Sequence, residues 1–350
     1  MKKLWLRFNW NLFLVIVFWV FAALLAYTLV GWLQADEKYA WFSRERFLIN
    51  WRESDPDKIR ESSLKLVGGI GAIVYLVIKY RERSDAERGD AESKLVAAVQ
   101  QLGDKDSPAA RIAGVYSLTE VADRYGADFH QRVVDVLCGY LRSERGYWQD
   151  RNKRRIVGGR PNGVNDNRYI STDGAVESTI IAVLRDNCAK NKTKGWHNCK
   201  IDLHNASFSE EVDLREIKCK KLKISQAYFG AKARFDGIEV EQYINVSTAY
   251  FRKGAFFANV DLSQTTQYCS FKGSKFRGAF NFSGTKFPTG LKSKIDIFEH
   301  ARFNISYRSK VVEGPYLPHI DGTVQGTLPP GSCWYNFKTN RRINILRNRP

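Results

Sequence analysis

Cysteine is scarce in this sequence, and the few cysteines lie far apart. There are six among 350 residues, and no CxxC pair occurs. This argues against a disulfide framework and against a tetrahedral zinc site, and a reducing compartment fits better. Cys188, His197 and Cys199 come nearest to a metal-ligand pattern, but their spacing is poor. We therefore predict no metal and no cofactor.

Common catalytic motifs are also absent. The five histidines form no HExxH, and the chain contains no P-loop and no GxSxG sequence. We therefore predict that the protein is not an enzyme.

Acidic residues are too few to balance the basic ones. Lys and Arg number 55 against 37 Asp and Glu, which gives a formal net charge of +18. This excess favours anionic surroundings, such as phospholipid headgroups, nucleic acid or an acidic partner. It is spread along the chain without one long basic run, as in a membrane protein with basic flanks.

What the sequence does contain begins with a long apolar run. Residues 12–33 include no charged side chain and would reach ~33 Å as a helix, enough to cross a bilayer core. Trp10 and Trp32 lie where interfacial aromatic residues belong. No small-residue cleavage site of the kind that ends a signal peptide follows, so we expect a retained anchor.

A second, weaker apolar run covers residues 64–80. It is short and contains Lys65, but its GGIG sequence would let another helix approach closely. We predict a two-helix transmembrane hairpin within residues 1–85, the alternative being a buried or interfacial second helix. A hairpin leaves both chain ends on one side. The loop between the runs is as basic as their flanks, and the unpaired cysteines favour the cytoplasm for residues 81–350.

Residues 86–190 are predicted to form a small helical domain. Ser107-Pro108 is a typical N-cap followed by a first-turn proline. A basic loop rich in Gly and Asn covers residues 151–168. Three stripes at helical spacing should be core: Val115, Leu118, Ala122 and Tyr125; Val133, Val134, Leu137, Tyr140 and Leu141; and Val176, Ile180, Val183 and Leu184.

From residue 201 to residue 290, a large apolar residue recurs every five or six positions, with one irregular step near Thr266. That spacing suits neither a helix nor a strand. Most of these residues are followed by polar residues or glycine, which form turns. A chain that turns a corner every five residues closes a square in about twenty, and the next coil stacks on it ~4.8 Å away.

Folding this segment in fours predicts four inward columns. Thr266 would lie in the weakest layer, the one with a polar inward pair. Outside, Lys218 and Lys220 would face Glu239 and Glu241 on the next coil. The predicted columns are Phe208, Phe229, Phe251 and Phe271; Leu214, Phe235, Phe257 and Phe276; Cys219, Val240, Leu262 and Phe282; and Leu203, Ile224, Val246, Thr266 and Phe287.

This pattern resembles pentapeptide-repeat proteins, whose fold is a right-handed quadrilateral β-helix. Residues 109–142 resemble the HEAT-like helical motif of a bacterial, especially actinobacterial, membrane-anchored subgroup, and residues 195–208 resemble its junction into the repeats. The resemblance implies an α+β multidomain protein in the bacterial cytoplasmic membrane, with no enzymatic activity. The repeat units are looser than the usual A(D/N)Lxx. Residues 291–350 match nothing recognised and are treated as a C-terminal segment or cap.

We expect a non-enzymatic, membrane-tethered scaffold that presents its β-helix to a cytoplasmic protein, because a solenoid has repeated faces and no natural cleft. Tyr228, Tyr250, Arg252 and Phe256 should point outward on adjacent coils and form a partner-binding patch. Alternatively, the C-terminal segment folds back over this patch through Tyr316, Trp334, Tyr335 and Phe337.

Other functions stay open. Paired membrane spans would also suit a membrane-perturbing effector in bacterial stress or anti-phage defence. A basic patch of Lys218, Lys220, Lys221 and Lys223 would suit a membrane anchor that binds nucleic acid. Homo-oligomers could form through the hairpin or the β-helix.

Overall fold

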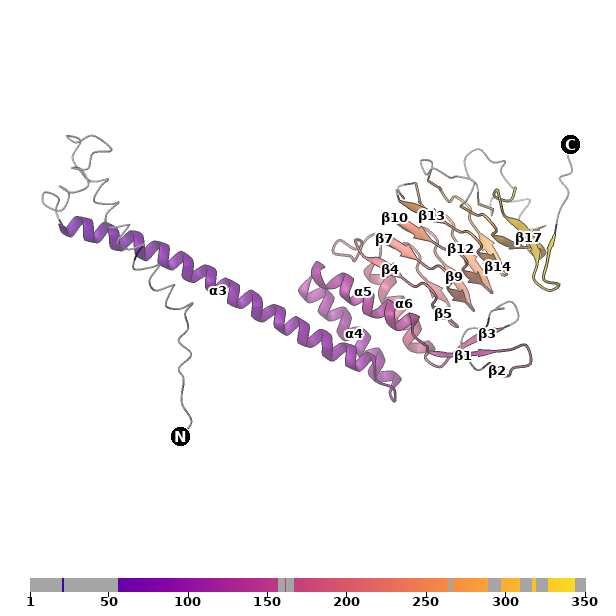
Figure 1. The fold of residues 1–350 in the computed structure, drawn as a ribbon, viewed down its shortest axis with the longest axis horizontal. Helices are drawn as coiled ribbons and strands as arrows, with labels where there is room; N and C mark the ends of the chain where they lie inside the picture. Colours follow the sequence, from indigo (N-terminus) through magenta and orange to yellow (C-terminus); the bar gives the residue numbers. More distant parts are fainter. Residues whose placement is uncertain are drawn as a thin grey trace. The chain divides into compact units, whose positions relative to one another are not determined.

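The fold is α+β, with helices followed by a β-solenoid of about four turns (Figure 1). The computed structural model describes residues 21, 56–156, 161, 167–263, 265, 267–288, 297–308, 317–318 and 327–343. Two compact units divide the chain, Met1–Asp90 and Ala91–Pro350. The predicted fold class is therefore confirmed at the level of helices followed by a solenoid.

Four α-helices occur among the described residues: α3 (Pro56–Leu102), α4 (Pro108–Tyr125), α5 (Ala127–Arg142) and α6 (Gly174–Asn187). The predicted start of α4 is confirmed, because the Ser107 side chain accepts a hydrogen bond from the Ala110 amide at 3.1 Å. All members of the three predicted stripes are buried except Tyr125 and Tyr140, which are partly buried. The helical core is thus the one the periodicity indicated.

The two predicted membrane spans have different outcomes. Residues 64–80 lie within α3. In the part of the chain that the structure describes, no helix reaches the length and apolar character needed to span a bilayer. Residues 12–33 lie outside the described residues, apart from Phe21.

The predicted basic loop, residues 151–168, contains one short strand and lies between two others. β1 (Gly146–Gln149), β2 (Arg155–Ile156) and β3 (Arg168–Ser171) form a three-stranded antiparallel sheet in the order β2-β1-β3. Trp148 pairs with Tyr169, and both side chains are buried. Aromatic and β-branched residues at these positions favour pleated structure. This sheet was not predicted, because its strands pair across a long connection that is rich in Gly and Asn.

The solenoid strands stack in parallel ladders, which we number as walls 1 to 4 in chain order around a coil. Wall 1 comprises β5 (Ser207–Phe208), β8 (Tyr228–Phe229), β11 (Tyr250–Phe251), β14 (Lys275–Phe276), β16 (Arg302–Asn304) and β17 (Cys333–Asn336). Wall 2 comprises β6 (Val212–Asp213), β9 (Lys232–Arg234), β12 (Gly254–Phe256) and β15 (Ala279–Asn281).

Walls 3 and 4 share two longer strands, β7 (Lys218–Lys223) and β10 (Glu239–Asn245). The first halves of these strands form wall 3, which continues through single bridges from Glu239 to Asp261 and on to Lys286. Their second halves form wall 4 with β4 (Lys200–Asp202) and β13 (Tyr268–Ser270). A bulge between Val240 and Tyr243 marks the corner.

The predicted inward columns are correct through Leu262 and wrong by one wall after it. Phe276, rather than Phe271, pairs with Phe251 in wall 1. Phe271 instead occupies the wall 4 column, where its ring stacks on Phe298 at 4.8 Å. Phe282 and Phe287 shift in the same way, since Phe282 stacks on Phe257 at 5.1 Å.

The cause is a longer corner. Nine positions separate Leu262 from Phe271, whereas five or six separate the earlier predicted centres. Residues 264 and 266, predicted as the polar inward pair, lie outside the described residues. Thr265 between them is buried, and its hydroxyl donates a hydrogen bond to the Val240 carbonyl at 2.9 Å.

A stack of five phenylalanine rings fills the interior behind wall 1. Its members are Phe208, Phe229, Phe251, Phe276 and Phe303. Successive ring centroids lie 5.3, 4.9, 5.2 and 4.8 Å apart, with interplanar angles between 3° and 12°. The strand spacing sets this repeat, and each ring gains dispersion contacts on both faces.

Two corners repeat a left-handed backbone conformation on successive coils. At the corner between walls 4 and 1, φ is 59° for Asn205, 59° for Gln226, 57° for Thr248 and 68° for Gly273. Gly273 thus takes the place of Thr248 one coil on, which supports the corrected register. Asn and Gly suit this conformation, whereas it is unusual for the β-branched Thr248.

Both ends of the solenoid are covered by other parts of unit Ala91–Pro350. At the first coil, the Gln131 side-chain amide of α5 pairs with the backbone of Lys200 in β4, donating to its carbonyl at 3.1 Å and accepting from its amide at 2.8 Å. At the other end, β16 and β17 continue wall 1 past residue 290, and β18 (Arg341–Ile343) pairs antiparallel with β17. The C-terminal segment therefore contains solenoid strands.

Candidate functional site: the outer walls of the solenoid

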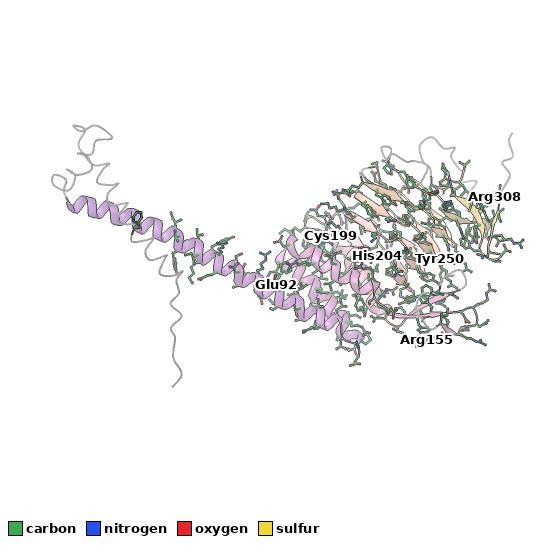
Figure 2. All side chains as sticks on the ribbon, in the orientation of Figure 1. Glu92, Arg155, Cys199, His204, Tyr250 and Arg308 are labelled. Atoms are coloured by element: carbon green, nitrogen blue, oxygen red, sulfur yellow. The ribbon has the colours of Figure 1, made fainter. Side chains whose placement is uncertain are left out.

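The outer face of wall 1 is aromatic but covered. Tyr228 and Tyr250 point outward and stack at 5.5 Å, yet their exposed fractions are only 0% and 1%. Trp148 packs against Tyr228 with ring centroids 4.7 Å apart, and Phe337 packs against Tyr250 at 6.5 Å. Figure 2 labels Tyr250 within the solenoid. These two tyrosines therefore belong to a second hydrophobic cluster, which lies outside the solenoid interior.

This arrangement changes the predicted partner-binding patch. Arg252 and Phe256 remain partly exposed, but Phe256 belongs to wall 2, where Arg234 lies 5.9 Å from its ring. The four residues consequently form no single surface. The alternative, a C-terminal segment folded over the tyrosines, holds for Tyr335 and Phe337. Trp334 instead pairs with Phe303 in the ladder, and Tyr316 lies outside the described residues.

The predicted basic patch is largely compensated by acids. Lys218 lies 3.8 Å from Glu239 and 3.5 Å from Glu241 on the next coil, as the sequence indicated. Lys223 lies 3.6 Å from Asp202. Lys221 lies 6.0 Å from the ring of Tyr243, and Lys220 is partly exposed. The patch is thus a mixed-charge surface across walls 3 and 4.

Wall 4 presents an aromatic pair that the sequence reading missed. Tyr243 and Tyr268 are Cα partners, and their rings stack at 5.0 Å. Tyr268 is 40% exposed, the highest exposure among large apolar residues of the described solenoid. The sequence does indicate this pair, because each tyrosine lies two positions before the end of its wall 4 strand, β10 or β13. The shifted register concealed it, because Phe271, three positions later, was predicted to lie in the column of wall 1.

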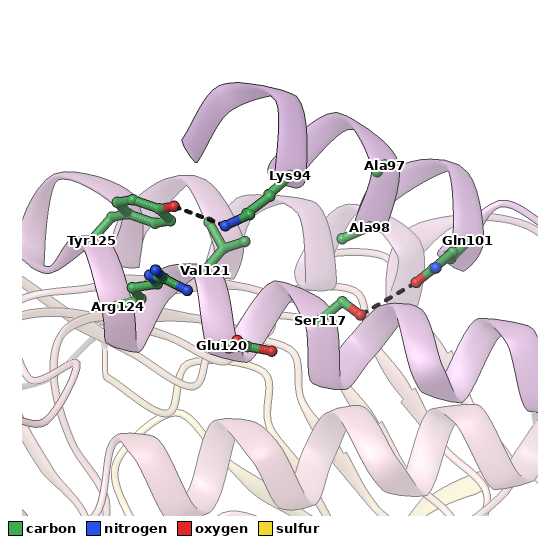
Figure 3. Close-up of a pocket in the computed structure, with 9 residues that line it drawn as sticks. All are labelled: Lys94, Ala97, Ala98, Gln101, Ser117, Glu120, Val121, Arg124 and Tyr125. Carbon is green, nitrogen blue, oxygen red and sulfur yellow. Dashed lines mark hydrogen bonds between the residues drawn. The ribbon is translucent and has the colours of Figure 1, made fainter. Parts of the chain in front are cut away.

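A pocket of about 250 Å³ lies between α3 and α4 (Figure 3). Its polar groups contact one another: the Lys94 ammonium donates to the Tyr125 hydroxyl at 3.3 Å, and the Ser117 hydroxyl donates to Gln101 at 3.3 Å. Lys94 and Arg124 both lie 5.8 Å from the Tyr125 ring. The lining residues are Lys94, Ala97, Ala98, Gln101, Ser117, Glu120, Val121, Arg124 and Tyr125. We assign this pocket no chemistry.

Buried thiols gather where the helices meet the first coils. Burial raises the pKa of Cys138 and Cys219 to about 12 and that of Cys199 to about 11. Such thiols stay protonated at neutral pH and behave as small apolar groups. His197 contacts the Ala189 carbonyl at 2.8 Å through Nε2. Within the described ranges, no group of three His, Cys, Asp or Glu residues could hold a metal ion.

A buried ion pair joins the helices to the first coil. Arg145, just after α5, donates to Glu177 of α6 at 2.7 Å and to the Ser207 carbonyl of β5 at 2.9 Å. Glu177 also accepts a hydrogen bond from the Glu210 amide at 3.1 Å. Burial raises the pKa of Glu177, and the Arg145 charge opposes that shift. This network links the helices to the first coil, so we assign it a structural role. The outer walls of the solenoid are the candidate site.

Searches of protein-family models, curated proteins and solved structures for relatives of this chain gave no match. The functional proposal below is therefore based on the geometry and composition of the solenoid walls.

Proposed function

We propose that the protein is a non-enzymatic, membrane-tethered scaffold whose solenoid walls bind a cytoplasmic protein. The observation that carries this proposal is the filled interior: stacked side chains occupy the inside of each coil, and outward rows form extended walls. Extended, repeated walls suit contact with another macromolecule better than the enclosure of a small substrate. The exposed Tyr243 and Tyr268 pair is the proposed contact point.

Membrane attachment is supported by two stretches in unit Met1–Asp90. Residues 12–33 are uncharged over a bilayer-spanning length. In α3, six large apolar side chains are exposed within one short stretch, and eight consecutive residues cover all sides of a helix. Water is a poor surrounding for such a segment, whereas lipid is a good one. The six are Ile73, Tyr75, Leu76, Val77, Ile78 and Tyr80.

We further propose that the solenoid is a right-handed quadrilateral β-helix of the pentapeptide-repeat kind, beside a HEAT-like helical domain. The recurrence of one large inward residue every five or six positions supports this assignment. On that basis the protein would lie in a bacterial cytoplasmic membrane, with residues 81–350 facing the cytoplasm.

Charged substitutions in the apolar run test the tether. The double variant Val20→Arg/Leu24→Arg should move the full chain from the carbonate-washed membrane fraction to the soluble or aggregated fraction, since each central arginine opposes insertion by about 2.5–3.5 kcal/mol. Val96→Arg is the matched control, because Val96 is an exposed apolar residue of α3 outside the run. An unchanged membrane fraction in the double variant would refute the tether.

Cross-linking and affinity purification from native membranes test the scaffold. Tyr268→Asp should remove co-purifying proteins that the wild-type chain retains, with unchanged thermal unfolding. Lys232→Asp, on the exposed side of wall 2, is the control. If both variants retain the same proteins, wall 4 is not the contact. Growth arrest with dye leakage on overexpression would favour the membrane-perturbing effector instead.

A further inference from the structure

We propose that the outer face of wall 1, together with β18, binds the phosphate backbone of a nucleic acid duplex. We call this surface the arginine face. It goes beyond the proposed scaffold function and does not depend on the membrane tether. The arginine face comprises Arg252, Lys275, Arg277, Arg302, Arg341 and Arg342.

The ladder places these cations in adjacent rows. Lys275 and Arg302 are direct Cα partners. Arg252 and Arg277 each follow a phenylalanine of the paired β11 and β14, so they occupy matching positions one coil apart. Arg342 pairs with Tyr335 at the far end. Like charges at one strand spacing, ~4.8 Å, repel each other, and an anion lying along the row would offset that repulsion.

The two outward rows of wall 1 contain no carboxylate. Arg252, Arg302, Arg341 and Arg342 form no ion pair with any described residue. The first row reads Ser207, Tyr228, Tyr250, Lys275, Arg302 and Cys333, and the second reads Ser209, Gly230, Arg252, Arg277, Asn304 and Tyr335.

Each of the other walls has at least one cation paired with an acid. Arg234 of wall 2 lies 2.8 Å from Glu211. Lys190 lies 3.2 Å from Glu239 of wall 3, and wall 4 has the contact of Lys223 with Asp202 already described. Within the described part of the chain, the arginine face therefore differs from the other walls in having four arginines, Arg252, Arg302, Arg341 and Arg342, without an ion pair, and such charge attracts a polyanion.

The composition of the face favours phosphate. Five of its six cations are arginines, whose planar guanidinium groups donate two parallel hydrogen bonds to one phosphate. A strand of regularly spaced phosphates can engage a row of such groups, and contacts of this kind fix position without reading bases.

Its aromatic residues are already engaged, which argues against other partners. Arg302 lies 4.7 Å from the Tyr335 ring, and Arg277 donates to the covered Tyr250 hydroxyl at 3.3 Å. The face therefore has no exposed aromatic anchor of the kind that a protein hot spot or membrane insertion uses.

Fluorescence anisotropy with a labelled duplex of about 20 base pairs and mixed sequence tests the proposal. The full chain in nonionic detergent should bind with an affinity that falls as salt rises, with a log–log slope of about −4 for four phosphate contacts. Arg302→Gln/Arg342→Gln should reduce the slope by about two and weaken binding at least tenfold in ~100 mM salt. Lys218→Gln/Lys223→Gln, two lysines that lie beside acids on walls 3 and 4, should lose less than a third as much.

Three results would overturn the proposal: no salt-dependent binding, an equal loss in the control variant, or stronger displacement of the duplex by short-chain phosphatidylglycerol than by unlabelled duplex at equal phosphate. The last result would assign the face to lipid headgroups. If Arg302→Gln impairs folding, Arg341→Gln/Arg342→Gln replaces it, since both residues are exposed strand positions.

Discussion

The solenoid and the helical region bury different kinds of side chain. Among the described residues, the inward columns of the solenoid are apolar, and its buried polar residues are three uncharged hydroxyl side chains. The helical region buries Arg145 and Glu177 as a pair. In the solenoid, side chains of similar shape stack on successive coils and so fix the register between those coils. The helical region has no repeat, and we infer that specific charge pairs select one arrangement of α5, α6 and the first coil.

Removing one ring from the phenylalanine stack should produce the largest effect. Phe251→Ala takes away a fully buried ring that contacts Phe229 and Phe276 on its two faces. We expect a loss of about 4 kcal/mol in the free energy of unfolding, measured by urea denaturation. Lys253→Ala, exposed on the same coil, should change it by less than ~0.5 kcal/mol. Equal effects would mean that the stack does not support the solenoid.

Breaking the buried pair should cost somewhat less and should depend on pH. Arg145→Met leaves the Glu177 carboxylate buried without its partner, so we expect a loss of about 3 kcal/mol at pH 7. Because the pKa of Glu177 is raised in the folded state, the native protein binds a proton more tightly than the unfolded chain does. Arg145 lowers this pKa, so its removal raises the pKa further and the variant gains more from proton uptake than the wild-type protein does. The loss should therefore shrink as the pH falls from 7 toward the ordinary pKa of the glutamate.

A double variant separates charge from shape at the same site. Arg145→Met/Glu177→Met should recover much of the stability that Arg145→Met loses, since no buried charge remains. If the double variant is as unstable as the single one at every pH, packing rather than charge holds the junction.

A smaller effect is expected where the two regions meet through a surface pair. A side-chain hydrogen bond from Arg215 chiefly lowers the pKa of Asp213 to about 2, and Arg185 of α6 adds to it at 3.2 Å. Asp213→Asn should cost about 1 kcal/mol at neutral pH, because Arg215 is half exposed and water screens the pair.

The pH dependence of this variant gives the check. A depressed carboxyl pKa contributes stability above its unfolded value, and that contribution is lost as the pH falls from about 4 through about 2. Thermal unfolding of the wild-type and Asp213→Asn proteins should therefore converge near pH 2. Asp186→Asn, at an exposed neighbouring residue, is the control and should change the stability by less than ~0.5 kcal/mol at neutral pH.

The smallest effect should come from the ladder of opposite charges on wall 3. Lys218→Ala removes contacts of 3.8 and 3.5 Å with two glutamates, but all three side chains are exposed to water. We expect a change of about 0.2–0.5 kcal/mol by urea denaturation, which should disappear in ~1 M salt. A salt-insensitive loss would show that the lysine stem, rather than its charge, packs on the wall.

The sequence predicts the parts of the solenoid that repeat. The prediction places Phe208, Phe229 and Phe251 correctly, because the same spacing recurs over three successive coils. The predicted register fails after Leu262. The irregular step near Thr266 is visible in the sequence, but counting Thr266 as an inward centre shifts every later column by one wall. The prediction of Phe271 above Phe251 was wrong for that reason alone.

The candidate surface could be predicted only in part. Outward positions of Tyr228 and Tyr250 followed from the repeat, but their burial depends on Trp148 and Phe337, which lie far away in the sequence. The arginine face likewise combines residues from β11, β14, β16 and β18. Its absence of carboxylates becomes visible only once the corrected register aligns the coils.

The Gln131 amide has a consequence for assembly. An open strand edge recruits further strands, and stacked coils offer such an edge at each end. By satisfying both backbone groups of Lys200 at the start of wall 4, one side chain occupies a position that a second molecule would need for end-to-end polymerisation. The helices that cover the first coil, with Gln131 among their contacts, therefore oppose fibre growth from that end.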